Sequence, residues 1–193
     1  MTAPCTKSQL RKSLRAARVE HVADLAEAVK GLVFHRPPAP ILANIAPGAV
    51  IGLYHAVGAE APADNYARFF HEAGHTIALP HFAAIGTAMQ FRQYSDPHGG
   101  SDLSAGPFGM VQPSADAAVL TPDVLFVPLV GFTADLARLG QGGGHYDRWL
   151  AEHPGRMAIG LAWDVQLVEA LPVEPHDAPL DAVVTPTRIY GLN

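Results

Sequence analysis

Residues 138–148 contain the side chains with the clearest chemical potential. Four of the seven residues from Arg138 to Gly144 are glycines, and glycine permits positive φ, so that successive backbone N–H groups can turn toward a ligand. A helical pattern begins at His145, and its free N–H groups would border the same loop. With Arg138 and Arg148 beside it, the stretch predicts an anion site for phosphate or carboxylate. Asp147 could hold a divalent cation there.

The glycine loop has other interpretations. Glycines punctuate surface turns, so the loop could be flexible and its charges solvated. It is not a Walker A loop, because no Lys-Ser or Lys-Thr pair follows Gly144. A dinucleotide-dependent oxidoreductase is a rival, since Gly140, Gly142 and the later Asp164 mimic that fingerprint. The mimicry fails because His145 replaces the third glycine and about ten residues separate the strand from the loop.

The elements that must position this loop are those of an α/β protein. Residues 124–130 are uncharged and rich in β-branched side chains, which is typical of a strand buried on both faces. Further strands are predicted at 49–54, 76–80, 88–94 and 157–163, and helices at 6–31 and 65–74. This alternation predicts a three-layer α/β/α sandwich with a mixed, mostly parallel sheet. The loop would lie outside the carboxyl end of a strand.

Composition sets the broad class. The chain has 193 residues, of which 49% are hydrophobic and 16% charged, as expected for a single globular domain over 1–193. No apolar run is long enough to span a membrane, and no secretory signal is visible. Cys5 stands alone, which fits a reducing cytoplasm. The net charge of −5 argues against nucleic-acid binding, so an anionic ligand must be met by local positive charge.

Such charge occurs near the N-terminus. Lys7, Arg11, Arg15 and Arg18 are separated by four, four and three residues, so on a helix they share an arc of about 80°. A basic stripe is usually a solvated face. Its functional interpretation is that the helix lies over an anionic ligand, where Lys and Arg donate to phosphate.

A second pattern must be weighed against this site. Residues His71 to His75 match H-E-x-x-H, in which two histidines on one helix bind zinc. Zinc binding requires the helix to continue through both histidines. Gly74 and the apolar residues that follow it predict a helix end entering a strand, which would turn His75 away from His71.

Several segments resemble one enzyme family. Residues 138–148 closely resemble the Arg-Leu-Gly-x-Gly-x-Gly-x-Tyr-Asp-Arg signature of the 5-formyltetrahydrofolate cyclo-ligases, and 127–132 resemble the Val-Pro-x-x-x-Phe that precedes it. Residues 7–11 are similar to the family's Lys-x-x-Leu-Arg. Residues 108–113 resemble Phe-Gly-Ile-x-Glu-Pro, with Gln112 in place of the glutamate, and 176–185 match the family's C-terminal His-Asp segment. These matches occur in family order over most of the chain.

The resemblance implies an activity. Members of this family use ATP and Mg²⁺ to cyclise 5-formyltetrahydrofolate to 5,10-methenyltetrahydrofolate, with release of ADP and phosphate. The partners are then ATP and the folate, with no nucleic acid or membrane, and the protein is expected to be a cytoplasmic monomer. A non-catalytic binder of reduced folates remains an alternative, because the sequence near Glu60 and at Gln112 departs from the family pattern.

The resemblance also assigns residues, position by position. It implies that ATP contacts Lys7, Arg11, Arg138, Leu139, Gly140, Gln141, Gly142, Gly143, Gly144, His145 and Tyr146. It implies that the folate contacts Arg11, His55, Glu60, Gln141, Gly142, Gly143, Gly144 and His145. It also implies that magnesium is held by Asp147 and Asp181. Without the resemblance, Asp177 and Asp181 would both be interpreted as loop caps. No side chain is assigned as a general base, and His145 could contact substrate or only fill space.

Overall fold

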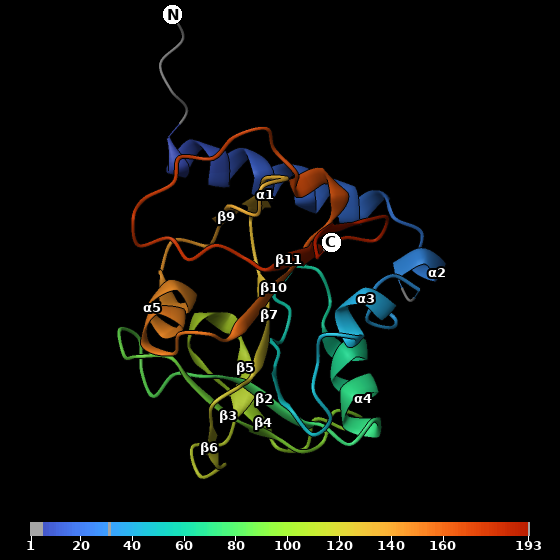
Figure 1. The fold of residues 1–193 in the computed structure, drawn as a ribbon, viewed down its shortest axis with the longest axis vertical. Coiled ribbons are helices and arrows are strands. Elements are labelled where there is room, and N and C mark those ends of the chain that lie inside the picture. Colours follow the sequence, from blue (N-terminus) through green and yellow to red (C-terminus); the bar gives the residue numbers. More distant parts are fainter. Residues whose placement is uncertain (1–5, 31, 193) are drawn as a thin grey trace, which may run out of the picture.

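The centre of the protein is one twisted sheet, seen in a computed structural model that describes residues 6–30 and 32–192 (Figure 1). Its eight strands follow the order β12-β11-β10-β7-β1-β2-β3-β6. β1 pairs in parallel with β2 and β7, and β10 in parallel with β7 and β11. The other pairs, β11 with β12, β2 with β3 and β3 with β6, are antiparallel. The bounds are β1 Val50–Gly52, β2 Thr76–His81, β3 Gln90–Tyr94, β6 Val119–Leu120, β7 Val124–Pro128, β10 Met157–Leu161, β11 Ala182–Val184 and β12 Ile189–Gly191.

Two small hairpin-like sheets lie outside this sheet. β4 (Leu103–Ala105) pairs with β5 (Val111–Pro113), and a 3₁₀ turn, η1 (Pro107–Gly109), lies between them. β8 (Gly131–Phe132) pairs with β9 (Arg138–Leu139) directly after β7. The second pair brings Arg138 back to the carboxyl end of β7, where the glycine loop begins.

Helices cover both faces of the large sheet. They are α1 Lys7–Asp24, α2 Glu27–Lys30, α3 Ala39–Leu42, α4 Asp64–Glu72 and α5 His145–Glu152, with a 3₁₀ turn η2 at Asp164–Gln166. Successive side chains of β7 point to opposite faces. Phe126 packs edge-on against Tyr66 of α4 at a centroid distance of 5.3 Å, whereas Leu125 belongs to the other core cluster with Trp149 of α5. The predicted mixed, mostly parallel sheet with helices on both faces is confirmed.

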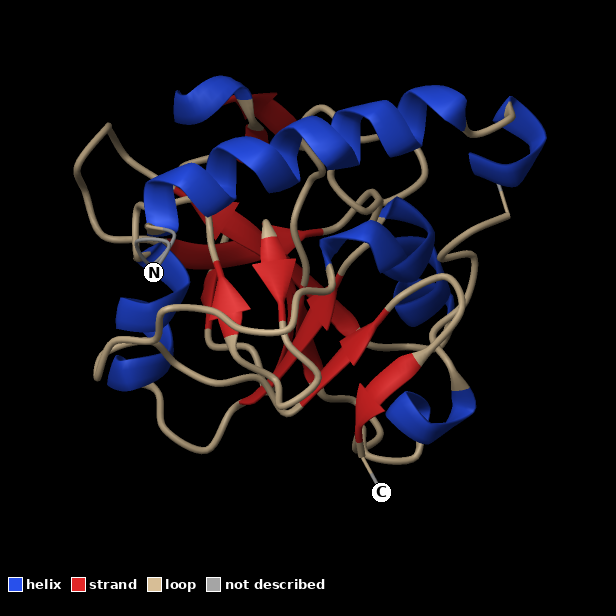
Figure 2. Cartoon of the chain, turned by 90° about the horizontal axis from the view of Figure 1, so that it is seen from above, coloured by secondary structure: helices blue, strands red, loops and turns tan. Residues whose placement is uncertain are grey.

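The first helix is shorter than predicted and lies across the sheet. Thr6 and Gln9 form the predicted capping box, but α1 ends at Asp24 rather than near residue 31. Leu25 is extended, with φ −71° and ψ 129°, and packs against the core, so the helix stops and α2 follows. α1 crosses the end of the sheet where β7 and its parallel neighbours finish (Figures 1 and 2), and Leu14 packs there on Val130 and Leu139. Within residues 6–30 and 32–192, no helix combines the length and apolar character needed to cross a membrane.

Candidate active site

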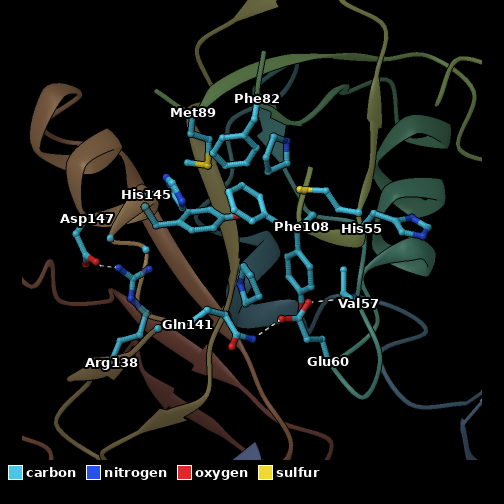
Figure 3. Close-up of a pocket in the computed structure, with 18 of the residues that line it drawn as sticks. His55, Val57, Glu60, Phe82, Met89, Phe108, Arg138, Gln141, His145 and Asp147 are labelled. Carbon is cyan, nitrogen blue, oxygen red and sulfur yellow. Dashed lines mark hydrogen bonds and ion pairs between the residues drawn. The ribbon is translucent and has the colours of Figure 1, made fainter. Parts of the chain in front are cut away.

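A cavity of about 570 Å³ opens at the carboxyl ends of the parallel strands. It is bordered by the segment after β1, the end of β2, Pro128 of β7 and the loop between β9 and α5. One side is apolar and aromatic and includes Phe82, Met89 and Phe108. The opposite side carries Glu60, Arg138, Gln141 and Asp147 (Figure 3). A flat organic ring with charged substituents would find both kinds of partner here.

The glycine loop is held in place by α1. Arg11 donates from Nε to the carbonyl of Gly140 at 2.9 Å, and Arg15 donates from Nη2 to the carbonyl of Gln141 at 3.0 Å. In a trans peptide, each carbonyl points opposite to the next N–H group. The N–H groups of Gln141 and Gly142 therefore turn away from α1. A flexible surface turn does not describe this loop.

Two glycines of the loop have conformations that other residues rarely adopt. Gly142 has φ +110°, and a Cβ there would lie 3.4 Å from Cζ of Arg11. Gly144 is the N-cap of α5 with φ +62° and ψ 20°, and no side chain caps this helix start. The first N–H groups of α5 therefore keep their donor capacity beside the cavity.

All four residues of the basic stripe have partners in the protein, although Arg15 remains exposed. Lys7 donates from Nζ to Glu174 and Asp177, each at 2.7 Å, Arg11 and Arg15 hold the glycine loop, and Arg18 is buried with 6% exposure. Burial alone would lower the pKa of Lys7, but hydrogen bonds to Asp177 and Glu174 outweigh it and raise that pKa. Lys7 contacts acids of the C-terminal segment and does not line the cavity.

Glu60 is fixed at the end of the loop that follows β1. Tyr54 donates to the carbonyl of Ala61, and Trp163 donates from Nε1 to the carbonyl of Ala59 at 2.9 Å. The Glu60 carboxylate accepts hydrogen bonds from Val57 N at 3.0 Å and from Gln141 Nε2 at 2.7 Å (Figure 3). His55 lines the same cavity and lies 3.6 Å from the Asp64 carboxylate.

Gln141 joins the two parts of the site. Its Oε1 accepts from Arg15 Nε at 2.9 Å and Nη2 at 2.6 Å, while its Nε2 donates to Glu60. A continuous chain of hydrogen bonds thus runs from α1 through the glycine loop to the carboxylate.

The two predicted metal ligands do not come together. Asp147 lies on the first turn of α5, lines the cavity, pairs with Arg138, and accepts from Ala178 N at 3.2 Å. Asp181 directly precedes β11, and its Oδ2 accepts from the N–H of Ala158 near the start of β10 at 2.7 Å. β10 and β11 are parallel, so Asp181 lies at the amino ends of both strands. The cavity lies at the opposite, carboxyl ends. Asp181 lines a separate hollow of about 370 Å³. The two carboxylates therefore bond to different segments, and their joint binding of a metal ion stays a prediction.

Another aspartate of the same segment lies nearer. Asp177 precedes Ala178, the residue that donates to Asp147, and it pairs with Lys7. Burial would raise the pKa of Asp177, but the hydrogen bonds from Lys7 and from the Glu174 N–H, together with the charges of Lys7 and His176, outweigh it and lower that pKa.

His145 faces an aromatic cluster. Its ring lies 4.8 Å from that of Phe82 and 5.8 Å from that of Phe108. Burial and the Arg148 charge lower the pKa of His145, so the ring is neutral near pH 7. Arg148 Nη2 lies 3.0 Å from Nδ1 of His145, and because a guanidinium only donates, Nδ1 accepts and Nε2 carries the proton. Tyr146 is half-buried beside the loop, and loss of solvent around its hydroxyl raises its pKa.

The H-E-x-x-H match has no common metal position. α4 ends at Glu72, so His75 lies beyond the helix, where its Nδ1 is 3.0 Å from the carbonyl of Ala49. His71 faces the ring of His98 at a centroid distance of 6.4 Å. Residues 71–75 therefore contain the end of α4 and the turn that precedes β2, as predicted.

Sequence reasoning missed several residues of the cavity. Gln112 does not itself line the cavity; it is buried and binds the backbone of Phe82, accepting from its N at 3.0 Å and donating to its carbonyl at 3.1 Å. This pairing fixes the aromatic wall. Phe82 lies in no motif, and although Met110 belongs to the 108–113 segment, nothing in the sequence indicated that it or Met89 lines the cavity. Arg18 had a signal, because it continues the spacing of the basic stripe.

Comparison with known proteins defines the class of the site. The sequence pattern that describes the 5-formyltetrahydrofolate cyclo-ligase family matches residues 4–186. A 5-formyltetrahydrofolate cyclo-ligase of Escherichia coli K12 is 40% identical over 126 residues, covering 61% of this chain and 67% of that protein. One from Mycolicibacterium smegmatis is 30% identical over 151 residues, covering 73% and 75%.

Solved structures agree in fold. The NMR structure of Aquifex aeolicus 5,10-methenyltetrahydrofolate synthetase has a TM-score of 0.75 at 25% identity and covers 97% of this chain and 93% of that one. A 5,10-methenyltetrahydrofolate synthetase from Mycoplasma pneumoniae has the same fold, with a TM-score of 0.66 at 23% identity and coverage of 92% and 96%.

These matches and the cavity at the carboxyl ends of the strands define an α/β ligase. The chain belongs to the 5-formyltetrahydrofolate cyclo-ligase family. The predicted family and enzyme class are confirmed.

Proposed function

We propose that this protein cyclises 5-formyltetrahydrofolate to 5,10-methenyltetrahydrofolate, consuming ATP with Mg²⁺ and releasing ADP and phosphate. The observation that carries the proposal is the single cavity that joins the glycine loop to Glu60 through Gln141. A reaction between a nucleotide and a folate needs both ligands in one space, and this cavity supplies a phosphate-type loop at one end and a carboxylate at the other.

The folate part of the cavity suits a pterin ring. The Glu60 carboxylate is a double acceptor, and a pterin carries an amino group beside a ring N–H that can donate to it. Phe82 and Phe108 supply aromatic surface for the ring, and His55 borders the opening. His145 packs among these rings in its neutral form and acts as a wall rather than a base.

The nucleotide part suits a polyphosphate. Lys7, Arg11 and Arg138 are the cations, and the loop from Leu139 to Tyr146 supplies backbone N–H groups through Gly140, Gln141, Gly142, Gly143 and Gly144. Such donors neutralise phosphate charge without covalent chemistry. Because Lys7 and Arg138 are ion-paired without a ligand, they must exchange a carboxylate for phosphate oxygens.

The residues present fit a magnesium ion only in part. Mg²⁺ is usually bound by one or two carboxylates together with phosphate oxygens and water. Asp147 suits this role, because the two hydrogen bonds to its carboxylate go to Oδ1 and Oδ2 stays available. Asp177 takes the place first given to Asp181, since it adjoins Asp147 through Ala178. When bound, the metal would neutralise charge on the transferred phosphate.

The reaction would begin at the formyl oxygen, which attacks the γ-phosphorus of ATP while the bond to the bridging oxygen breaks and ADP leaves with the electron pair. N10 then attacks the formyl carbon, and phosphate departs with the carbon–oxygen electron pair as N10 loses its proton. The protein's contribution is to align the two anions and offset their charge.

The activity is tested by the rise in absorbance of the methenyl product with ATP and 5-formyltetrahydrofolate. Asp147→Ala should abolish ATP turnover while the folate still binds. Asp135→Ala, at an exposed position between β8 and β9, is the matched control and should keep full turnover. Unchanged turnover in Asp147→Ala would remove Asp147 from the proposed site.

A non-catalytic folate binder is the second candidate. It is favoured by the departure of the sequence after Glu60, where Ala61 and Ala63 are buried and Asp64 contacts His55 instead of the cavity floor. Folate binding without ATP-dependent product formation would support it. Reduction or oxidation of a nicotinamide dinucleotide would instead support the oxidoreductase.

A further inference from the structure

Arg18 is the one member of the basic stripe that reaches the floor of the cavity. It lies three residues after Arg15 on α1, lines the cavity and is only 6% exposed. Lys7, Arg11 and Arg15 contact acids or the glycine loop. Arg18 points inward to the end of β7 instead, where Nη1 donates to the carbonyl of Leu129 at 3.2 Å.

The hydrogen bonding of this guanidinium is incomplete. Nε is buried and has no partner, and the Leu129 carbonyl is shared with Gln166 Nε2, which lies closer at 2.7 Å. Within residues 6–30 and 32–192, no carboxylate lies within 4.0 Å of Arg18. The burial of its charge lowers the pKa of Arg18.

A buried cation with one shared neutral acceptor is costly to the fold. Leu or Met would fill the same volume at lower cost, so the free donors need another explanation. In binding sites, such donors are satisfied by an acceptor that the ligand brings.

The surroundings restrict the chemistry of that acceptor. Glu60 is the carboxylate whose charge acts most strongly on Arg18, yet it forms no ion pair with it. Both line the same cavity, with Tyr54 beside them and Phe82 and Phe108 as its aromatic wall. The Glu60 carboxylate offers two acceptor oxygens, and the Arg18 guanidinium offers N–H donors on the same cavity. The complementary ligand is a flat heterocycle whose edge has two adjacent donors followed by an acceptor.

The 2-amino-4-oxo edge of a pterin has this order. Its 2-amino group and N3–H are donors, and the carbonyl at C4 is the adjacent acceptor. We propose that Arg18 donates a hydrogen bond to the 4-oxo group of the folate pterin while Glu60 accepts from the 2-amino group and N3–H. Arg18 thereby selects 4-oxo over 4-amino ring systems. This inference rests on the proposed function and adds a specificity-determining residue to it.

The test compares two ligands in two proteins. Dissociation constants are measured by calorimetry for 5-formyltetrahydrofolate and for its 2,4-diamino counterpart, in the wild-type protein and in Arg18→Met. The wild type should prefer the 4-oxo compound, and Arg18→Met should reduce that preference by roughly tenfold to a hundredfold, because a hydrogen bond to a charged group is lost. The diamino ring also changes the donor at N3, but Glu60 is present in both proteins, so its contribution cancels in the ratio of preferences.

Two further variants complete the test. Lys12→Met removes one positive charge from an exposed position of the same helix and should leave the preference unchanged. Arg18→Lys keeps the charge with fewer donors and should reduce the preference by a smaller factor. If Arg18→Met does not fold, Arg18→Lys decides the question.

The outcomes separate this inference from the proposed function. Folded Arg18 variants that keep the wild-type preference would overturn the role of Arg18, while the proposed activity would stand. If the wild-type protein binds neither compound, the proposed function fails and this inference fails with it.

Discussion

Lys7 gives the sharpest prediction about nucleotide binding, because the role proposed for it requires it to separate from two acids. Without a ligand its Nζ lies 2.7 Å from both Glu174 and Asp177. A phosphate that attracts Lys7 must compete with these carboxylates. In Glu174→Gln one competitor loses its charge while the side-chain volume is kept. We therefore expect magnesium-free ATP to bind more tightly to Glu174→Gln than to the wild type.

The size of the effect follows from the exposure of the pair. The Glu174 side chain is 53% exposed and that of Lys7 19%, so solvent weakens their attraction. A pair of this kind contributes about 0.5–1 kcal/mol, which corresponds to roughly two- to fivefold in the dissociation constant. Asp177 remains in place and limits the gain. High salt should reduce the difference, because the partners are partly exposed.

The measurement is calorimetric titration with ATP in the presence of a chelator, at low and high salt. Glu20→Gln is the control, since it removes one negative charge from an exposed position of α1. Equal tightening in both variants would mean that net charge is responsible. Weaker binding in Glu174→Gln would refute the competition altogether.

Two further predictions concern the walls of the cavity. Gln112→Glu should destabilise the protein by about 1–3 kcal/mol at pH 8, because an ionised carboxylate cannot donate to the Phe82 carbonyl. Burial should raise the pKa of the new carboxyl, so its neutral form donates at low pH and stability is lost as pH rises. Melting temperatures that fall equally at pH 5 and pH 8 would contradict this. His145 should titrate below its usual pKa near 6.5, so protonating it in acid costs stability. Arg148→Met should bring its pKa part of the way back, because burial persists. An NMR titration that shows no rise in Arg148→Met would count against the Arg148 contact.

The sequence predicted the fold and the loop because local patterns encode them. The strand at β7, the glycine loop and the start of α5 are adjacent in the chain, and their glycine content and apolar runs determine them directly. The basic stripe was also predictable, since helical spacing is a local property. The stripe contacts the glycine loop because Leu14 of the same helix packs on Val130 and Leu139.

The parts that could not be predicted depend on the path of the chain. Asp177 and Asp181 are four residues apart in an irregular segment, and nothing local tells which of them adjoins the residue, Ala178, that donates to Asp147. The hydrogen bonds of Asp181 to β10 place it at the far end of the sheet. The clamp of Gln112 on Phe82 joins residues 30 positions apart, and a substitution that looked like a lost charge is a structural contact.

The contacts of α1 with the glycine loop also limit how this chain can be altered. Arg11 and Arg15 hold the loop carbonyls, Lys7 binds the C-terminal segment and Arg18 reaches the cavity floor. In the proposed complex, a single surface helix would complete both ligand sites at once. Any truncation, splice variant or fusion that displaces residues 7–24 would disable both together, however intact the sheet beneath remained.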